Sequence, residues 1–300
     1  MPAWNDILLE LSAKDVRGTP ITDADALRRK YLRAFYEMSN RNVIAYYSGF
    51  LTRFSERSNI DDNDMNGFMN AVHGLDKAKG LDLILHTPGG TISSACAIVD
   101  YLRSVFNKDI RCFVPQEAMS AGTMIACSCK SIFMGKHSSI GPIDPQFGAM
   151  STGDVIEEAM KAKTEMSKDR GSIPYWTALL AKYPPAFIGK CEKAVQFAVE
   201  NVKKWLAENM FDEDSDKQGK IDAIVNGLSD HSLTKQHDKH ITIDEAQKLG
   251  LHIEALEDTP ELQDVLLSIH HTYMLTFSGN AKVAKIIENH ENKTMVLFHS

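Results

Sequence analysis

The stretch LDLILHTPGGT, residues 81–91, decides how the rest of the chain is interpreted. Its first seven residues form an almost continuous apolar run that ends at Pro88, Gly89 and Gly90. An apolar run bounded by turn residues is typical of a strand that is buried on both faces of a parallel sheet. The helix-like segment 92–105 follows directly, so the stretch predicts a strand, a tight glycine turn and a helix.

The same alternation of strand and helix signals continues on both sides of this stretch. Further strands are expected at 42–51, 109–115 and 131–135, with helix-like segments between them. Repeated strand–helix units of this length imply βαβ crossovers around a parallel sheet. We therefore predict an α/β core over residues 42–150.

The flanking segments are expected to be mainly helical. Apolar residues recur at helical spacing after Asp23, and residues 151–215 predict long amphipathic helices. Residues 55–66 are interpreted as a polar, acidic loop, and residues 285–300 as a helix followed by a strand. These patterns divide the chain into an N-terminal helical extension (1–41), a main domain (42–255) and a C-terminal helical and extended tail (256–300).

The composition is that of a soluble globular protein. Of the 300 residues, 43% are apolar and 24% are charged, which is enough to bury a sizeable core. The formal net charge of −7 argues against binding to duplex nucleic acid, because a protein that does so carries a basic surface. Asp6 and Glu10 interrupt the N-terminal region and no apolar run reaches about 18 residues, so neither a signal peptide nor a transmembrane segment is expected. Five cysteines, an odd number, predict reduced thiols and a cytoplasmic location.

The sequence gives no signal for a metal or a cofactor. Cys127 and Cys129 do not have a usual zinc spacing, and neither the phosphate-loop motif nor the dinucleotide-binding glycine motif is present. His231, His237 and His240 cluster in one segment. We interpret that segment as a surface loop rather than as a metal site.

A second turn with small residues follows the strand expected at 109–115. Ser120 lies in PQEAMSAGT, residues 115–123, where a strand signal meets a helix signal. A serine at such a turn can be presented like the nucleophile of esterases, with the N–H group of Ala121 beside it. The alternative interpretation is a serine that only caps the helix.

Three segments in this order, LILHTPGG, AMSAGT and FMGKHSSIGPIDPQFG, make the chain similar to the Clp protease and signal peptide peptidase A superfamily. The similarity extends in particular to the serine dehydrogenase proteinase branch and covers roughly residues 42–255. It implies a Clp/crotonase-like parallel βαβ core with additional C-terminal helices, and a serine peptidase domain over 42–255. It also implies that Ser120 is the nucleophile and that Gly89 or Gly90, together with Ala121, forms an oxyanion hole.

The general base is less clearly indicated. Asp144 stands where the Clp histidine is expected, and His137 does not match that position. Signal peptide peptidases use a lysine instead, and Lys193 resembles the lysine that opens the corresponding helix; Asp144, His137, Lys161 and Lys168 are kept as alternatives. A lysine acts as a base only in its neutral form, so burial must lower the pKa of such a lysine from about 10.4.

The resemblance therefore predicts a serine endopeptidase with a Ser-Lys dyad that cleaves peptide or protein substrates. An extended peptide is expected beside the Gly-Gly strand as an added β-strand, and the fold implies a homo-oligomeric ring. Two alternatives remain open. One is a crotonase-like enzyme that acts on an acyl-CoA thioester through the same oxyanion hole, and the other is a Clp-fold scaffold without activity.

Overall fold

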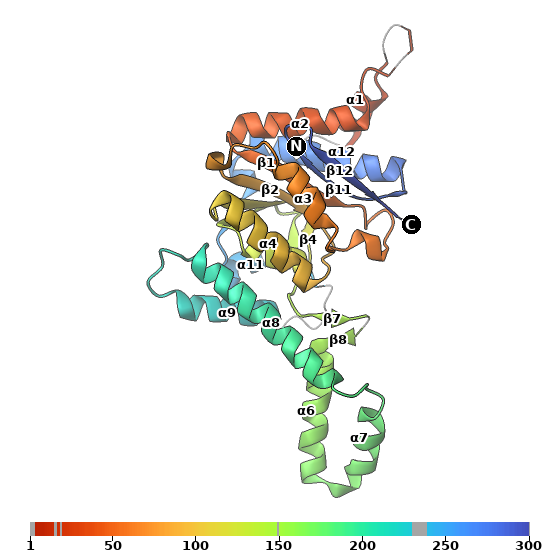
Figure 1. Ribbon diagram of the computed structural model, residues 1–300, viewed down its shortest axis with the longest axis vertical. Helices are drawn as coiled ribbons and strands as arrows, with labels where there is room; N and C mark the ends of the chain where they lie inside the picture. Colours follow the sequence, from red (N-terminus) through yellow and green to blue (C-terminus); the bar gives the residue numbers. More distant parts are fainter. Residues whose placement is uncertain (1–3, 15–16, 19, 149, 230–238, 300) are drawn as a thin grey trace.

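The computed structural model describes residues 4–14, 17–18, 20–148, 150–229 and 239–299 and has the predicted α/β architecture (Figure 1). Its helices are α1 (Trp4–Ser12), α2 (Ala24–Ser39), α3 (Asp64–Val72), α4 (Ile92–Phe106), α5 (Ala121–Cys127), α6 (Thr152–Lys168), α7 (Ile173–Leu180), α8 (Phe187–Glu208), α9 (Lys217–Ser229), α11 (Ile243–Leu249) and α12 (Pro260–Gly279). Its strands are β1 (Asn42–Ser48), β2 (Leu81–His86), β3 (Ile110–Val114), β4 (Glu117–Ala118), β5 (Ser131–Met134), β6 (Ser139–Ile140), β7 (Gln146–Phe147), β8 (Met150–Ser151), β9 (Ile241–Thr242), β10 (Ile253–Ala255), β11 (Val283–Asn289) and β12 (Thr294–Phe298).

The main sheet has seven strands in the order β10-β5-β3-β2-β1-β11-β12. The first five are mutually parallel, whereas β11 is antiparallel to β1 and β12 is antiparallel to β11. The apolar run predicted from the sequence is β2, and all its residues are buried. Its central position explains why the run is apolar on both faces.

Helices cover both faces of this sheet (Figure 1). On β1, Ile44 and Tyr46 pack with the core formed by α3, α4 and α5, whereas Val43 and Tyr47 pack with α2 and α12. Because successive side chains of a strand point to opposite faces of the sheet, alternate residues of β1 belong to two separate cores.

Two small sheets lie beyond the carboxyl ends of the parallel strands. One has the order β4-β6-β9, and the other is the β7-β8 hairpin. β4 is joined to the end of β2 by a parallel bridge between Thr87 and Ala118. This connection holds the two predicted turns, after β2 and after β4, next to each other.

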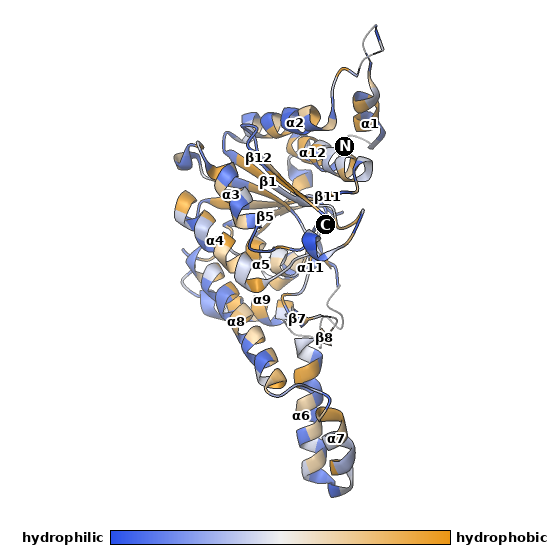
Figure 2. Ribbon diagram, turned by 45° about the vertical axis from the view of Figure 1, so that its right-hand side comes forward, coloured by the Kyte–Doolittle hydropathy of each residue, from blue (hydrophilic) through white to orange (hydrophobic). Residues whose placement is uncertain are grey.

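A helical arm projects from the body of the protein. Figures 1 and 2 show α6 and α7 extending away from the main sheet, with the N-terminal part of α8 beside them. Trp176 on α7 is buried, and its Nε1 donates to Glu165 Oε2 on α6 (2.9 Å). Short segments after Lys168 and after Leu180 separate these three helices.

The segment after residue 282 differs from its prediction. Residues 285–289, expected as part of a helix, belong to strand β11, which lies between β1 and β12 in the main sheet. Lys285, Glu288 and Asn289 are fully buried there. The helical prediction was wrong because the charges in this strand are neutralised by partners far away in the sequence, such as Arg28 for Glu288 (2.6 Å).

Within the described ranges, no helix is both long enough and apolar enough to cross a membrane.

Candidate active site

Ser120 lies at the sharp turn between β4 and α5. Its backbone has φ 50° and ψ −114°, a conformation that residues with a side chain rarely adopt. Ser120 occupies the N-cap position of α5, but its side chain makes no capping hydrogen bond. The side chain is half-buried between Met119 and Ala121, which are both buried. The geometry therefore resembles a presented nucleophile more than a helix cap.

The turn at Ser120 is fixed by the segment that follows β6. Thr123 Oγ1 donates to the carbonyl oxygen of Ala118 (2.8 Å) and accepts from the N–H group of Gly141 (2.9 Å). A β-carbon at Gly141 would lie 3.3 Å from the backbone nitrogen of Ser120. The segment 141–145 therefore packs directly against the turn.

The glycine turn after β2 contacts Ser120 from another side. Gly89 has φ 101°, and a β-carbon there would lie 2.8 Å from both Ser120 Cβ and the carbonyl oxygen of Met119. A side chain is excluded on both grounds, so the turn requires glycine. Thr87 N–H donates to the carbonyl oxygen of Glu117 (3.0 Å), which joins the two turns through their backbones.

The backbone of this turn is held by Ile60, in the segment interpreted from the sequence as a polar loop. Ile60 N–H donates to the carbonyl oxygen of Gly89 (2.7 Å), and Thr91 N–H donates to the carbonyl oxygen of Ile60 (3.0 Å). Successive residues of an extended chain direct their N–H groups to opposite edges. The N–H group of Gly90 therefore points away from Ile60.

Among the described residues, two backbone N–H groups near Ser120 have no assigned acceptor. Gly89 N–H is used, because it donates to Thr87 Oγ1 (3.1 Å). For Gly90 N–H and Ala121 N–H, the structure assigns no acceptor among the residues it describes. Gly90 and Ala121 thus have the free N–H groups that an oxyanion hole needs.

Asp144, which stands where the Clp histidine is expected, is buried. It lies in the segment 141–145, and Ser151 Oγ donates to Asp144 Oδ2 (3.4 Å). Ser151 in turn caps α6 by accepting from the N–H groups of Gly153 and Asp154. Asp144 thus connects the segment that packs on Ser120 to the start of the helical arm.

The three candidate lysines all lie on that arm. Lys161 and Lys168 are exposed on α6, and Lys193 is exposed near the start of α8. Within the described part of the chain, no hydrogen bond or ion pair joins any of them to Ser120. His137 is also exposed, in the turn after β5. Among the residues that the structure describes in one chain, none of these three lysines is therefore hydrogen-bonded to the proposed nucleophile.

His86, the last residue of β2, belongs to a buried cluster that sequence reasoning missed. Its ring packs against the rings of Tyr47 (5.4 Å between centroids), Phe50 (5.0 Å) and His270 (5.3 Å). Neither ring nitrogen of His86 has a hydrogen-bond partner in the described structure. Burial lowers the pKa of His86 to about 3 and that of His270 well below its ordinary value. Only the distance along the chain between His86 and His270 hid this cluster.

Glu117 on β4 is a second ionisable group close to the turn. Burial raises the pKa of Glu117, and the nearby His240 opposes that shift. His240 Nδ1 lies 2.7 Å from Ser139 Oγ, which fixes the start of β9 against β6. The other two members of the predicted histidine cluster, His231 and His237, lie outside the described residues.

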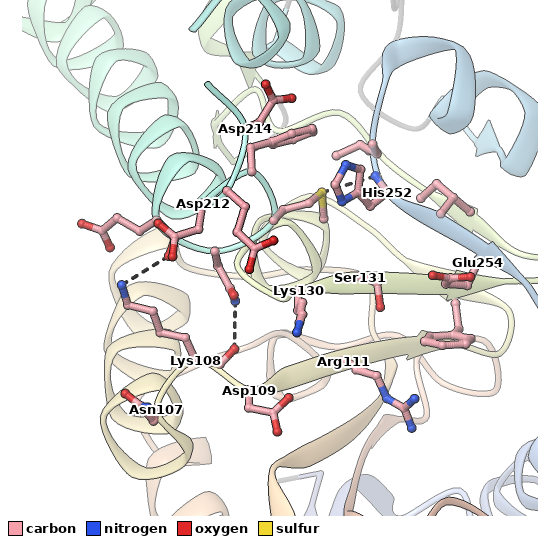
Figure 3. A pocket seen from close by; sticks show the side chains of 18 of the residues that line it. Asn107, Lys108, Asp109, Arg111, Lys130, Ser131, Asp212, Asp214, His252 and Glu254 are labelled. Carbon is pink, nitrogen blue, oxygen red and sulfur yellow. Dashed lines mark hydrogen bonds between the residues drawn. The ribbon is translucent and has the colours of Figure 1, made fainter. Parts of the chain in front are cut away.

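A charged cavity of about 1260 Å³ lies at the opposite edge of the sheet (Figure 3). Arg111, Lys130, Asp109 and Glu254 line it at the amino ends of β3, β5 and β10. In parallel α/β sheets, sites form at the carboxyl ends of the strands. We therefore place the candidate site at Ser120 rather than in this cavity.

No group of three or more metal-ligating side chains is present among the residues described.

The fold and the two facing turns define a chain of ClpP-like architecture. The family model for ClpP-like SDH-type serine proteinases matches residues 28–261, and the chain belongs to this family.

The chain is 28% identical over 211 residues to the uncharacterized protein MJ0137 of Methanocaldococcus jannaschii, a match covering 70% of this chain and 65% of that protein. It is 26% identical over 194 residues to the uncharacterized protein MJ1495 of the same organism, covering 65% of this chain and 59% of that protein. Among solved structures, it is similar to a mutant of the 1510-N membrane-bound stomatin-specific protease (20% identity, TM-score 0.40), over 69% of this chain and 79% of the other.

Proposed function

We propose that this chain is a serine endopeptidase in which Ser120 Oγ attacks the carbonyl carbon of a peptide bond. The observation that carries the proposal is the contact between the serine turn and the glycine turn. Ser120 has a positive φ, and Gly89 approaches it so closely that no side chain fits between them. Membership of a serine proteinase family supports the same chemistry.

The proposed oxyanion hole consists of the N–H groups of Gly90 and Ala121. Both donors are free in the described structure, and Ala121 directly follows the nucleophile. Attack by Ser120 moves negative charge onto the carbonyl oxygen, and two fixed donors stabilise that charge without reorganising. Gly89 contributes by letting the two turns approach each other rather than by donating a hydrogen bond.

Lys193 is proposed as the general base, with Lys161 and Lys168 as the alternatives. The base would take the proton from Ser120 Oγ during attack and give it to the leaving amine. Because Lys193 is exposed in a single chain, this role requires that a substrate or a second copy covers it. We accordingly keep a homo-oligomeric ring, a cytoplasmic location and a peptide or protein substrate as parts of the proposal.

The assignment is tested by measuring how fast the Ser120→Ala variant hydrolyses an unfolded protein such as casein. We expect the variant to lose activity by several orders of magnitude while its Tm stays close to that of the unmodified chain. The matched control is Ser104→Ala, an exposed serine on α4. Turnover retained in purified Ser120→Ala would contradict the assignment.

A further inference from the structure

Lys285 on β11, the strand between β1 and β12, is a lysine that the proposed reaction does not use. It is fully buried on β11, although a lysine is almost never fully buried unless it is paired. Its Nζ lies 2.6 Å from Asp64 Oδ1 and 3.3 Å from Asp61 Oδ2. It also donates to the carbonyl oxygen of Asn59 (2.7 Å).

These contacts all lie in the segment around Ile60. Asn59 and Asp61 flank Ile60 in the sequence, and Asp61 N–H donates to Asp64 Oδ2 (3.0 Å). Tyr46 OH donates to the same oxygen (2.9 Å), so Asp64 is fixed from the sheet as well. The ammonium group therefore holds both sides of Ile60 in place.

Ile60 is the residue that orients the glycine turn. Its N–H and C=O groups bind Gly89 and Thr91, and a β-carbon at Gly90 would lie 2.3 Å from the backbone nitrogen and oxygen of Ile60. Because a trans peptide directs its C=O and N–H groups oppositely, the bond from Ile60 to the Gly89 carbonyl turns the Gly90 N–H away from Ile60. The direction of the proposed oxyanion donor thus depends on where Ile60 is held.

We infer that Lys285 is a positioning residue for catalysis: through Asn59 and Ile60 it fixes the peptide between Gly89 and Gly90 so that the Gly90 N–H is preorganised for the oxyanion. The inference rests on the proposed function. It assigns a role to a strand that lies more than 160 residues after the proposed nucleophile in the sequence.

The test compares Lys285→Met with Lys282→Met, a matched control at an exposed lysine just before β11. The first readout is amide hydrogen exchange at Ile60 and Thr91, which needs no activity. The second is the rate at which a fluorophosphonate labels Ser120, together with the final labelled fraction. We expect both amides to exchange faster in Lys285→Met. We also expect the probe to label this variant about 10- to 100-fold more slowly, which reaches the lower end of the loss from one missing oxyanion donor, although labelling still goes to completion. Lys282→Met should behave like the unmodified chain.

A purely structural role would give a different result. It would lower the labelled fraction and the Tm but leave the labelling rate of the folded molecules unchanged. Unchanged exchange at Ile60 and Thr91, or faster exchange with an unchanged labelling rate, overturns the inference. Failure of the unmodified chain to label would contradict the proposed function instead, and the exchange readout would still decide whether Lys285 holds the turn.

A second variant guards against unfolding, because Lys285→Met leaves the carboxylate of Asp64 buried without its ion pair. The double variant Lys285→Met with Asp64→Asn removes that charge and keeps an acceptor for Tyr46. It still lacks the donor to Asn59, so we expect the same slow labelling with a higher Tm. Restored labelling in the double variant would overturn the role of Asn59 in the inference.

Discussion

At the scale of single residues, the candidate site depends on a glycine, because a side chain at position 89 would collide with the serine turn. Gly89→Ala would place a methyl group 2.8 Å from Ser120 Cβ at a φ of 101°. We expect a loss of roughly 10²–10³ in kcat/KM, because the two turns must move apart and the oxyanion donors move with them. Peptide hydrolysis by the purified variant measures this loss.

The matched control is Gly74→Ala. Gly74 also has a positive φ (87°), but nothing lies within 4 Å of its β-carbon position. The control therefore carries the backbone strain without the steric contact. Equal activity in the two alanine variants would contradict the close contact between Gly89 and the proposed nucleophile.

At the scale of elements, the open question is which helix of the arm supplies the base. If Lys193 on α8 takes the proton from Ser120, both Lys193→Ala and Lys193→Arg should be nearly inactive, because a guanidinium group cannot accept a proton at these pH values. Lys204→Ala, an exposed lysine on the same helix, serves as the control. Initial rates of peptide hydrolysis decide the matter, and full activity in Lys193→Ala would pass the role to Lys161 or Lys168 on α6, or to His137.

The elements also show what the sequence could and could not predict. The strand–turn–helix units around Gly89 and Ser120 follow from local patterns, because apolar runs and small residues mark them directly. β11 did not follow, since Lys285 and Glu288 are paired with Asp64 and Arg28, which lie more than 200 residues away. A pattern read within one window contains no information about such partners.

The candidate site divides in the same way. The positions of Ser120, Gly89 and Gly90 were predictable from motif order, whereas the role of Ile60 was not. Its contacts with the glycine turn are made by the backbone, and backbone hydrogen bonds leave no mark on residue type. The proposal of Gly90 rather than Gly89 as the donor likewise rests on the hydrogen bond from Gly89 N–H to the Thr87 hydroxyl, which the sequence does not reveal.

At the scale of the whole molecule, the buried histidines make stability depend on pH. Burial lowers the pKa of His86 from 6.5 to about 3 and that of His270 in the same direction. Below pH 6.5 the unfolded chain therefore binds protons that the folded chain does not, and stability falls with falling pH. We expect a loss of up to about 1.4 kcal/mol per pH unit for His86 between pH 6 and pH 4, and a further loss in the same direction from His270.

Urea unfolding at a series of pH values measures this dependence. His270→Phe should flatten the slope by removing one of the two buried groups. His73→Phe, at an exposed histidine that ends α3, should leave the slope unchanged. An unchanged slope in His270→Phe would mean that this imidazole does not resist protonation in the folded chain.

The central claim, that Ser120 is an activated nucleophile, is tested most directly by a fluorophosphonate probe and mass spectrometry of the labelled peptide. The account predicts one probe per chain, attached to Ser120, and no labelling of Ser120→Ala. Binding of an acyl-CoA without labelling would indicate the crotonase-like alternative, and a folded chain that neither labels nor binds would indicate an inactive scaffold. Either of these results, or labelling at another serine, would contradict the account.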